Sequence, residues 1–287
     1  MYPDFICIGA QKAGTTWLHH NLRQHPQIWL PPVKELHYLD HKPPSLYKRL
    51  FGKPAHLREA RLHLKKTLIS FPACASLDDL RWALRYSLGR RNDRWYASLF
   101  PKLDGRLTGE VCPGYARMTE AQVCELHTKM PDARIIYLLR NPVDRAWSTT
   151  VMHFNKPKYG GIEKADDEQI LAHVADQRTQ RHSDYLSNLA AWEHSYGDNF
   201  YVGFFDELQL DPVSFLRGVL DFLGVNSGAG MIPEGVDRKV NKGTVETVPA
   251  RFRPLLWDLY GEQIAGLHEK YRKAYTEKWL KAGPDGA

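Results

Sequence analysis

A short turn near the N-terminus has the residue types of an anion-binding loop. An apolar run at 5–9 is followed by the loop 10–14 and then by a helical pattern of apolar residues. Backbone N–H groups at the start of such a helix, together with the positive end of its dipole, attract anions. Gly9 and Gly14 allow the backbone to approach the anion closely. The order of strand, loop and helix therefore predicts a phosphate-binding site.

The position of its lysine distinguishes this loop from the P-loop of kinases and NTPases. Those enzymes place a lysine directly after the second glycine, where this chain has Thr15, and the lysine here is Lys12, inside the loop. They also need a carboxylate for magnesium at the end of a buried strand. The strand predicted at 133–139 ends in Arg140 instead. Both departures disfavour a kinase, which stays open as an alternative.

A second anion site is predicted where that strand meets the next helix. Pro142 suits the first turn of a helix, because its missing N–H costs nothing there. Ser148 lies on the same predicted helix, so the strand end and the helix can converge on one phosphate. The competing interpretation is that Ser148 is an ordinary surface residue.

The segment 34–40 presents a carboxylate and an imidazole together. In an extended segment, alternation would place Glu35 and His37 on one side and Leu36 on the other. Beside an anion-binding loop, such a pair could remove a proton from an acceptor hydroxyl. A Lys-Glu pair at a strand end is more often a solvated turn, so this pair alone is weak evidence.

A third basic segment surrounds a glycine near the C-terminal end, at 238–244. Basic side chains and backbone N–H groups around a glycine can wrap a phosphate. A charged surface turn is the alternative interpretation.

Together these motifs resemble the sulfotransferases that use 3′-phosphoadenosine 5′-phosphosulfate (PAPS). The loop similar to their 5′-phosphosulfate loop consists of Lys12, Ala13, Gly14, Thr15 and Thr16. The pair Arg140 and Ser148 resembles their 3′-phosphate site, and their loop over the 3′-phosphate and adenine corresponds to Asn241, Lys242, Gly243 and Thr244. Separated motifs in the right order are more specific than any one of them.

The segment 34–40 is similar to the Lys-Glu-x-His-Phe-Phe-Asp segment of heparan-sulfate-type sulfotransferases, in which the Glu is the catalytic base. The resemblance implies that Glu35 is the base, that His37 orients it or the acceptor, and that Lys12 stabilises the leaving phosphate. The segment 110–115 resembles their Glu-Lys-Ser/Thr-Pro-x-Tyr, except that their lysine is Val111 here. An identical acceptor is therefore not implied.

The resemblance and the alternation of strands with helices imply an α/β, P-loop-like three-layer fold with a central parallel sheet flanked by helices. We expect a single sulfotransferase domain over 1–287, with a basic helical insertion at about 45–100. The implied reaction moves a sulfuryl group from PAPS to a hydroxyl of a carbohydrate or small molecule. No metal is expected, because fixed cations replace it. A non-catalytic module that binds anionic glycans through the basic region is the other alternative.

Composition narrows the class of protein further. An apolar content of 43% and a charged content of 25% are ordinary for a globular protein, and the net charge of +6 suits anionic ligands. No nucleic-acid reader motif occurs, so no nucleic-acid partner is expected. Without an apolar run of ~18 residues or a signal peptide, we expect a cytoplasmic protein with no transmembrane segment. A soluble form trimmed of an N-terminal anchor is the lesser possibility.

Two further features could contact the acceptor. His153 follows the second motif on the same predicted helix, and the loop 155–161 could close over a substrate or simply connect two elements. A lone histidine is more often structural, so His153 ranks below Glu35 as a base. The four cysteines form no C-x2-C pair and are expected to be reduced.

Overall fold

The computed structural model describes residues 1–40, 55–70, 76–238 and 247–284, and the side chains within these ranges except those of 55–59 and 61. Two predicted features lie partly or wholly outside these residues. They are the basic region at 41–54 and 71–75, and the loop residues Asn241, Lys242, Gly243 and Thr244.

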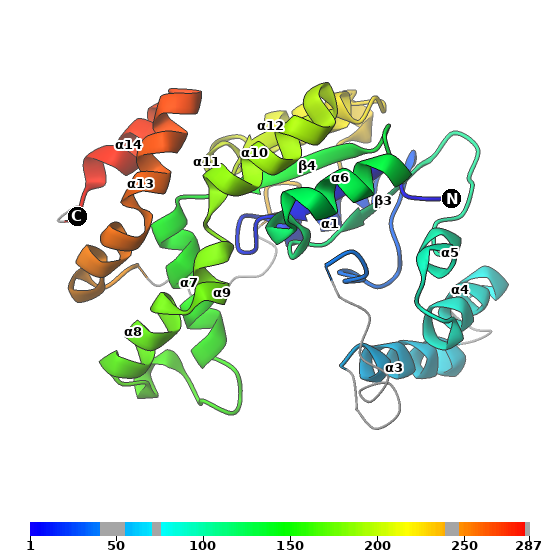
Figure 1. Cartoon of the computed structure of the whole chain (residues 1–287). Coiled ribbons are helices and arrows are strands. Elements are labelled where there is room, and N and C mark those ends of the chain that lie inside the picture. The colour runs from blue at the N-terminus through cyan, green and yellow to red at the C-terminus, as the bar shows by residue number, and fades with distance from the viewer. Residues whose placement is uncertain (41–54, 71–75, 239–246, 285–287) are drawn as a thin grey trace.

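Five parallel strands form the central sheet (Figure 1). In the order β2-β3-β1-β4-β5 they are β2 (Ile28–Trp29), β3 (Leu107–Val111), β1 (Phe5–Gly9), β4 (Arg134–Leu139) and β5 (Phe200–Phe204). Every residue of β1 is buried, as expected for a parallel sheet covered on both faces. The chain passes from β1 to β2 at one edge of the sheet, returns to β3, and then crosses β1 to reach β4 and β5 on the other side. The carboxyl ends of β1 and β4 therefore lie where the strand order reverses. Ligands of open α/β sheets bind at that point.

Helices alternate with the strands, and this confirms the predicted α/β fold. They are α1 (Thr15–Leu22), α6 (Glu120–Lys129), α7 (Pro142–Phe154), α8 (Asp167–Ala175), α9 (Gln177–Arg181), α10 (Tyr185–Tyr196), α11 (Phe205–Leu210), α12 (Pro212–Phe222), α13 (Arg253–Tyr271) and α14 (Ala274–Ala282). Short 3₁₀ turns are η1 (Tyr115–Arg117), η2 (Ile162–Lys164), η3 (Gly197–Asn199), η4 (Ala229–Met231) and η5 (Ala250–Phe252). Figure 1 shows α13 and α14 together at one end of the molecule.

Local signals explain where these helices begin. Pro142 occupies the first turn of α7 as predicted, and the Asn141 side chain caps that helix by accepting the N–H of Val143. The first residue of α6 follows Thr119, whose side chain forms a capping box with Gln122. The strand-to-helix connection after β4, which carries Arg140, is therefore set by nearby residues.

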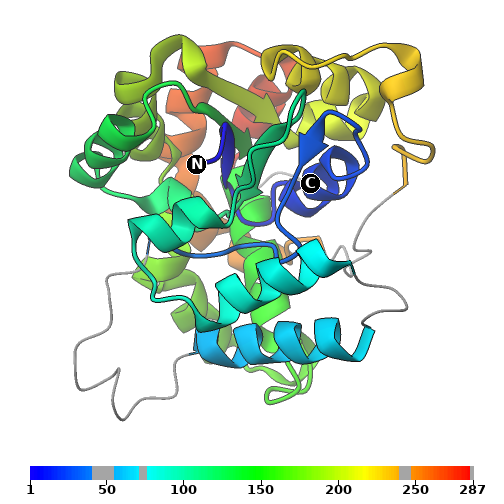
Figure 2. The ribbon, with the colours of Figure 1, turned by 90° about the vertical axis from the view of Figure 1, so that its right-hand side faces the viewer.

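In its described part, the basic region contains three helices, gathered at the end of the molecule away from α13 and α14 (Figures 1 and 2). They are α3 (Ala55–Ser70), α4 (Leu77–Leu88) and α5 (Asp93–Ser98). Trp82 stacks on Tyr86 with ring centroids 5.1 Å apart, and both belong to a buried aromatic cluster with Trp95 and Tyr96. This cluster holds α4 and α5 against the segment 33–39.

One local prediction is wrong: the segment 34–38 is not extended. It forms no strand, and Glu35 and His37 have positive φ angles of 61° and 50°. The side chain of Leu36 is buried, and hydrogen bonds from other elements, rather than pairing with a strand, set this backbone.

Within the described parts of the chain, no helix combines the length and the apolar character that crossing a bilayer requires.

The pairing of β1 with β3 requires a glycine at 109. A Cβ atom there would overlap the ring of Phe5, which is fully buried. We expect Gly109→Ala to lower the free energy of unfolding by about 1–3 kcal/mol, as overpacking does in other cores. Urea unfolding measures this change. Gly230→Ala is the control, because a Cβ there meets no atom within 4 Å. Equal stability of the two variants would contradict the packing argument.

Candidate active site

The loop between β1 and α1 has the backbone of an anion site. Lys12 and Gly14 both have left-handed φ angles, 71° and 92°, and Gly14 is the N-cap of α1. A Cβ atom on Gly14 would lie 2.6 Å from Leu208 Cδ2 and 3.2 Å from the Phe205 ring. Glycine is therefore required by both conformation and space. The first turn of α1 contains no acidic residue, so nothing there competes with a bound anion for the helix dipole.

The second motif meets this loop. The Arg140 guanidinium donates from Nη1 to the backbone carbonyl of Lys12 at 3.1 Å and lies 4.9 Å from the centroid of the Phe205 ring. Burial, followed by the charge of Arg140, lowers the pKa of Lys12, and burial also lowers the pKa of Arg140. Two cations that are far apart in the sequence thus lie in the same partly buried region, where a bound anion would relieve their repulsion.

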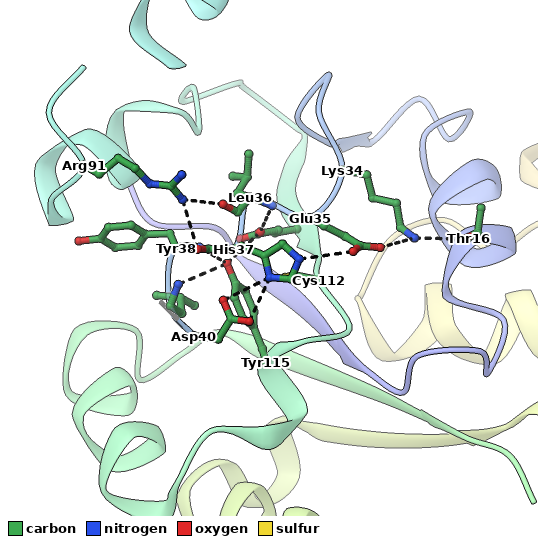
Figure 3. Close-up of polar contacts among 12 residues, drawn as sticks. Thr16, Lys34, Glu35, Leu36, His37, Tyr38, Asp40, Arg91, Cys112 and Tyr115 are labelled. Carbon is green, nitrogen blue, oxygen red and sulfur yellow. Dashed lines mark hydrogen bonds and ion pairs between the residues drawn. The ribbon is translucent and has the colours of Figure 1, made fainter. Parts of the chain in front are cut away.

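The segment 34–40 adds a chain of charged groups beside the loop (Figure 3). Lys34 Nζ donates to Thr16 Oγ1 at 3.0 Å and pairs with Glu35 Oε1 at 3.0 Å. The other carboxylate oxygen of Glu35 lies 3.5 Å from His37 Nε2, and His37 Nδ1 lies 3.0 Å from Asp40 Oδ2. Glu35 and His37 are therefore together, as predicted, although by a different backbone geometry.

These contacts determine the charge states. Burial alone would raise the pKa of Glu35, but the hydrogen bonds from His37 and Lys34 outweigh it and hold the pKa below the usual range. The hydrogen bond to Asp40, with those to Cys112 and Glu35, raises the pKa of His37 to about 12. The neutral-pH state is thus an ionised Glu35 beside an imidazolium. Glu35 is able to accept a proton in this state, and His37 is not.

Three further positions that the sequence singled out lie on α7 and β3. Ser148 lies half-buried on α7, in the strand-to-helix unit that begins at Arg140. Val111 is 2% exposed and belongs to the apolar core, so this chain presents no cation at the position of the resembled lysine. His153 lies against His173 and Tyr159, with ring centroids 4.1 and 4.6 Å away, and its pKa is lowered by burial.

Residue-type reasoning missed three members of the site: Lys34, Asp40 and Phe205. The first two lie within the segment that suggested Glu35, and their charges next to a candidate base were the available signal. No such signal pointed to Phe205, because an aromatic residue at the end of a strand usually belongs to the hydrophobic core. Its contacts with Gly14 and Arg140 arise only from folding.

Among the described residues, no group of three or more His, Cys, Asp or Glu side chains is arranged to hold a metal ion. The predicted metal-free chemistry stays a prediction, because a nucleotide can bring a metal ion with it.

We predict that His37→Asn raises the pKa of Glu35, because burial then acts against one fewer hydrogen-bonded cation. A titration of carboxyl ¹³C chemical shifts measures this, with Glu35→Gln assigning the signal. His268→Asn, on α13 and bonded to Thr276, is the control and should leave the Glu35 signal unchanged. An unchanged or lower pKa in His37→Asn would contradict the described electrostatics.

Comparisons with known proteins agree with the predicted family. A sulfotransferase family profile matches residues 3–227. Heparan sulfate glucosamine 3-O-sulfotransferase 6 of Homo sapiens is 27% identical over 156 residues, which are 54% of this chain and 32% of that protein. Heparan sulfate glucosamine 3-O-sulfotransferase 3A1 of Mus musculus is 24% identical over 229 residues, 78% of this chain and 46% of that protein. The chain thus spans less than half the length of these curated relatives.

Solved structures show the same fold. A sulfotransferase from Alicyclobacillus acidocaldarius aligns with a TM-score of 0.65 over 97% of this chain and 99% of that one, at 22% identity. The sulfotransferase domain of the Synechococcus PCC 7002 olefin synthase aligns with a TM-score of 0.53 over 90% and 87%, at 20% identity. Because the family profile covers most of the chain and the fold agrees with it, this protein belongs to the sulfotransferase family.

Proposed function

We propose that this protein transfers a sulfuryl group from PAPS to an acceptor hydroxyl. The observation that carries the proposal is the contact between Arg140 and the Lys12 carbonyl, which joins the two nucleotide motifs at the carboxyl ends of β1 and β4. Lys34 links Glu35 to Thr16 of the same loop, so a carboxylate base stands beside the phosphosulfate position.

In this reaction the acceptor oxygen attacks sulfur as the bond from sulfur to the bridging oxygen breaks. Glu35 takes the acceptor proton, and the ionised state that its pKa favours is the state required. Lys12 stabilises the charge that develops on the leaving phosphate, assisted by the amides of the loop through Ala13 and Gly14 and by the hydroxyls of Thr15 and Thr16. His37, held as an imidazolium, orients the carboxylate rather than accepting the proton.

The 3′-phosphate would be bound by Arg140, Ser148 and the segment 241–244. The described residues on either side of that segment support this assignment. Val236 accepts a hydrogen bond from Trp17 of α1 at 2.7 Å, and Val248 packs in the cluster of Trp147 on α7. Helix α1 follows β1, and α7 follows β4, so each helix comes directly after one of the two motifs. Fixed cations then hold the donor for in-line transfer without a metal.

For the acceptor, we propose a hydroxyl of a carbohydrate or small molecule. Heparan sulfate and carbohydrate are the acceptors in the names of several relatives, which favours a sugar. The region 45–100 contains twelve Lys and Arg residues and four Asp and Glu residues, so it is basic enough to attract an anionic acceptor. We also propose that 1–287 form one domain, because the main core cluster includes residues from Phe5 to Trp279.

Calorimetric titration in EDTA tests the donor site. We expect tight binding of 3′-phosphoadenosine 5′-phosphate (PAP) and little response to ATP. Magnesium-dependent ATP binding without PAP binding would support the kinase alternative. PAP binding without turnover of any acceptor would favour the glycan-binding module.

Arg140→Ala should weaken PAP binding by about 1.5–3 kcal/mol, the usual contribution of a hydrogen bond to a charged group. Adenosine 5′-phosphosulfate, which lacks the 3′-phosphate, should lose much less affinity. Arg134→Ala is a matched control, because Arg134 begins the same strand and its Nη1 donates to the Leu223 carbonyl. Equal losses of affinity for both nucleotides would show that Arg140 does not bind the 3′-phosphate.

Glu35→Gln should lower turnover at least tenfold while PAP affinity stays within about twofold, because general base catalysis commonly contributes 10²–10⁴-fold. Transfer of ³⁵S from PAPS to heparan sulfate, chondroitin sulfate or 4-nitrophenol measures turnover. The control is Glu193→Gln, another lysine-paired glutamate, on α10. Wild-type turnover in Glu35→Gln would show that another group is the base.

A further inference from the structure

The buried carboxyl group of Glu110 contacts the segment that carries the candidate base, and no role has been assigned to it so far. Glu110 is 1% exposed near the end of β3 and accepts three hydrogen bonds. The donors are the backbone N–H of Leu36 at 2.9 Å, the Tyr115 hydroxyl at 3.0 Å and the Tyr96 hydroxyl at 2.5 Å. All three are neutral groups, so the bonds replace hydration without a paired cation.

The Tyr115 hydroxyl extends this network to the rest of the segment 35–39. It accepts the N–H of Tyr38 at 3.1 Å and lies 3.5 Å from the N–H of Leu39. From the opposite side, Arg91 Nη2 donates to the carbonyls of Leu36 and His37 at 2.7 and 3.2 Å (Figure 3). The backbone around the candidate base is thus held by side chains from β3, η1 and the connection between α4 and α5, and not by a strand partner.

This segment needs such support because its conformation is unfavourable by itself. Glu35 and His37 both have left-handed φ angles, which non-glycine residues adopt only when the surroundings impose them. If the N–H groups of Leu36, Tyr38 and Leu39 lost these hydrogen bonds, the backbone would relax. Glu35 would then no longer be held close to Lys34 and His37.

We propose that Glu110, acting with Tyr115, is a positioning residue that fixes the segment 35–39 so that Glu35 faces the phosphosulfate loop. The proposal rests on the function proposed above and extends it to residues that touch neither donor nor acceptor.

The electrostatics of Glu110 separate this role from simple stabilisation of the core. Burial raises the pKa of Glu110 to about 7, against the hydrogen bonds of Tyr96, Tyr115 and Leu36 and the charge of His37. When the pKa of an acid is higher in the folded state than in the unfolded state, the protein becomes less stable as the pH rises through the folded-state pKa. At pH 8 the charge on Glu110 therefore opposes folding, and a glutamine in its place should not destabilise the protein.

The test uses Glu110→Gln and Tyr115→Phe in the full chain. Both should lower the rate of ³⁵S transfer at saturating PAPS at least tenfold, with PAP affinity within twofold of wild type by calorimetry. The Tm of Glu110→Gln at pH 8 should not fall below that of wild type. Tyr275→Phe is the matched control, since it also removes a bond from a tyrosine hydroxyl to a glutamate, at 2.7 Å between α14 and α11.

Two readouts decide the proposal even if none of the offered acceptors is turned over. In Tyr115→Phe the amides of Tyr38 and Leu39 should exchange hydrogen at least tenfold faster than in wild type, and the ¹³C-detected pKa of Glu35 should rise as its cations move away. Unchanged exchange and an unchanged Glu35 pKa would overturn the positioning role, as would wild-type turnover in both variants. Failure of wild type to bind PAP would instead contradict the proposed function and leave the exchange results to decide the positioning role.

Discussion

The contact between the Arg140 guanidinium and the Lys12 carbonyl is the interaction on which the site depends. It exists because β1 and β4 are parallel neighbours with a register that carries Phe5 beside Arg134 and Gly9 beside Tyr137, so both strands end at the same edge. Neighbouring parallel strands have their carboxyl ends at the same edge of the sheet, so the loops that follow them lie close together whatever their own sequences. The loop after β1 and the Arg140 side chain therefore meet as a consequence of sheet topology.

Charge is arranged in two layers around this contact. Lys12 and Arg140 repel each other in a partly buried place, which makes the loop receptive to an anion. In the neighbouring segment, Lys34 and His37 keep Glu35 ionised although burial favours its neutral form. The same electrostatic effects thus produce a cationic loop and an ionised carboxylate next to it, joined through Lys34 and Thr16.

Much of the fold was predictable because its signals are local. The apolar runs of β1 and β4, the proline and asparagine at the start of α7, and the left-handed glycine before α1 are each determined by neighbouring residues. The conformation of 34–38 was not predictable in this way. Alternation indicated an extended segment, whereas Glu110, Tyr115 and Arg91 hold it in a left-handed form from positions far along the chain.

The sequence by itself determined the family, the order of the elements and the positions of the two motifs that follow β1 and β4, because these depend on residue types at short spacings. The tertiary structure decided which residues surround the motifs: Phe205 against Gly14 and Arg140, and Glu110 beneath the candidate base. It also decided the charge states, since the pKa of Glu35, His37 or Glu110 follows from burial and from partners brought close by folding. Contacts between distant residues leave no periodic pattern in a single chain, so no local reading could supply them.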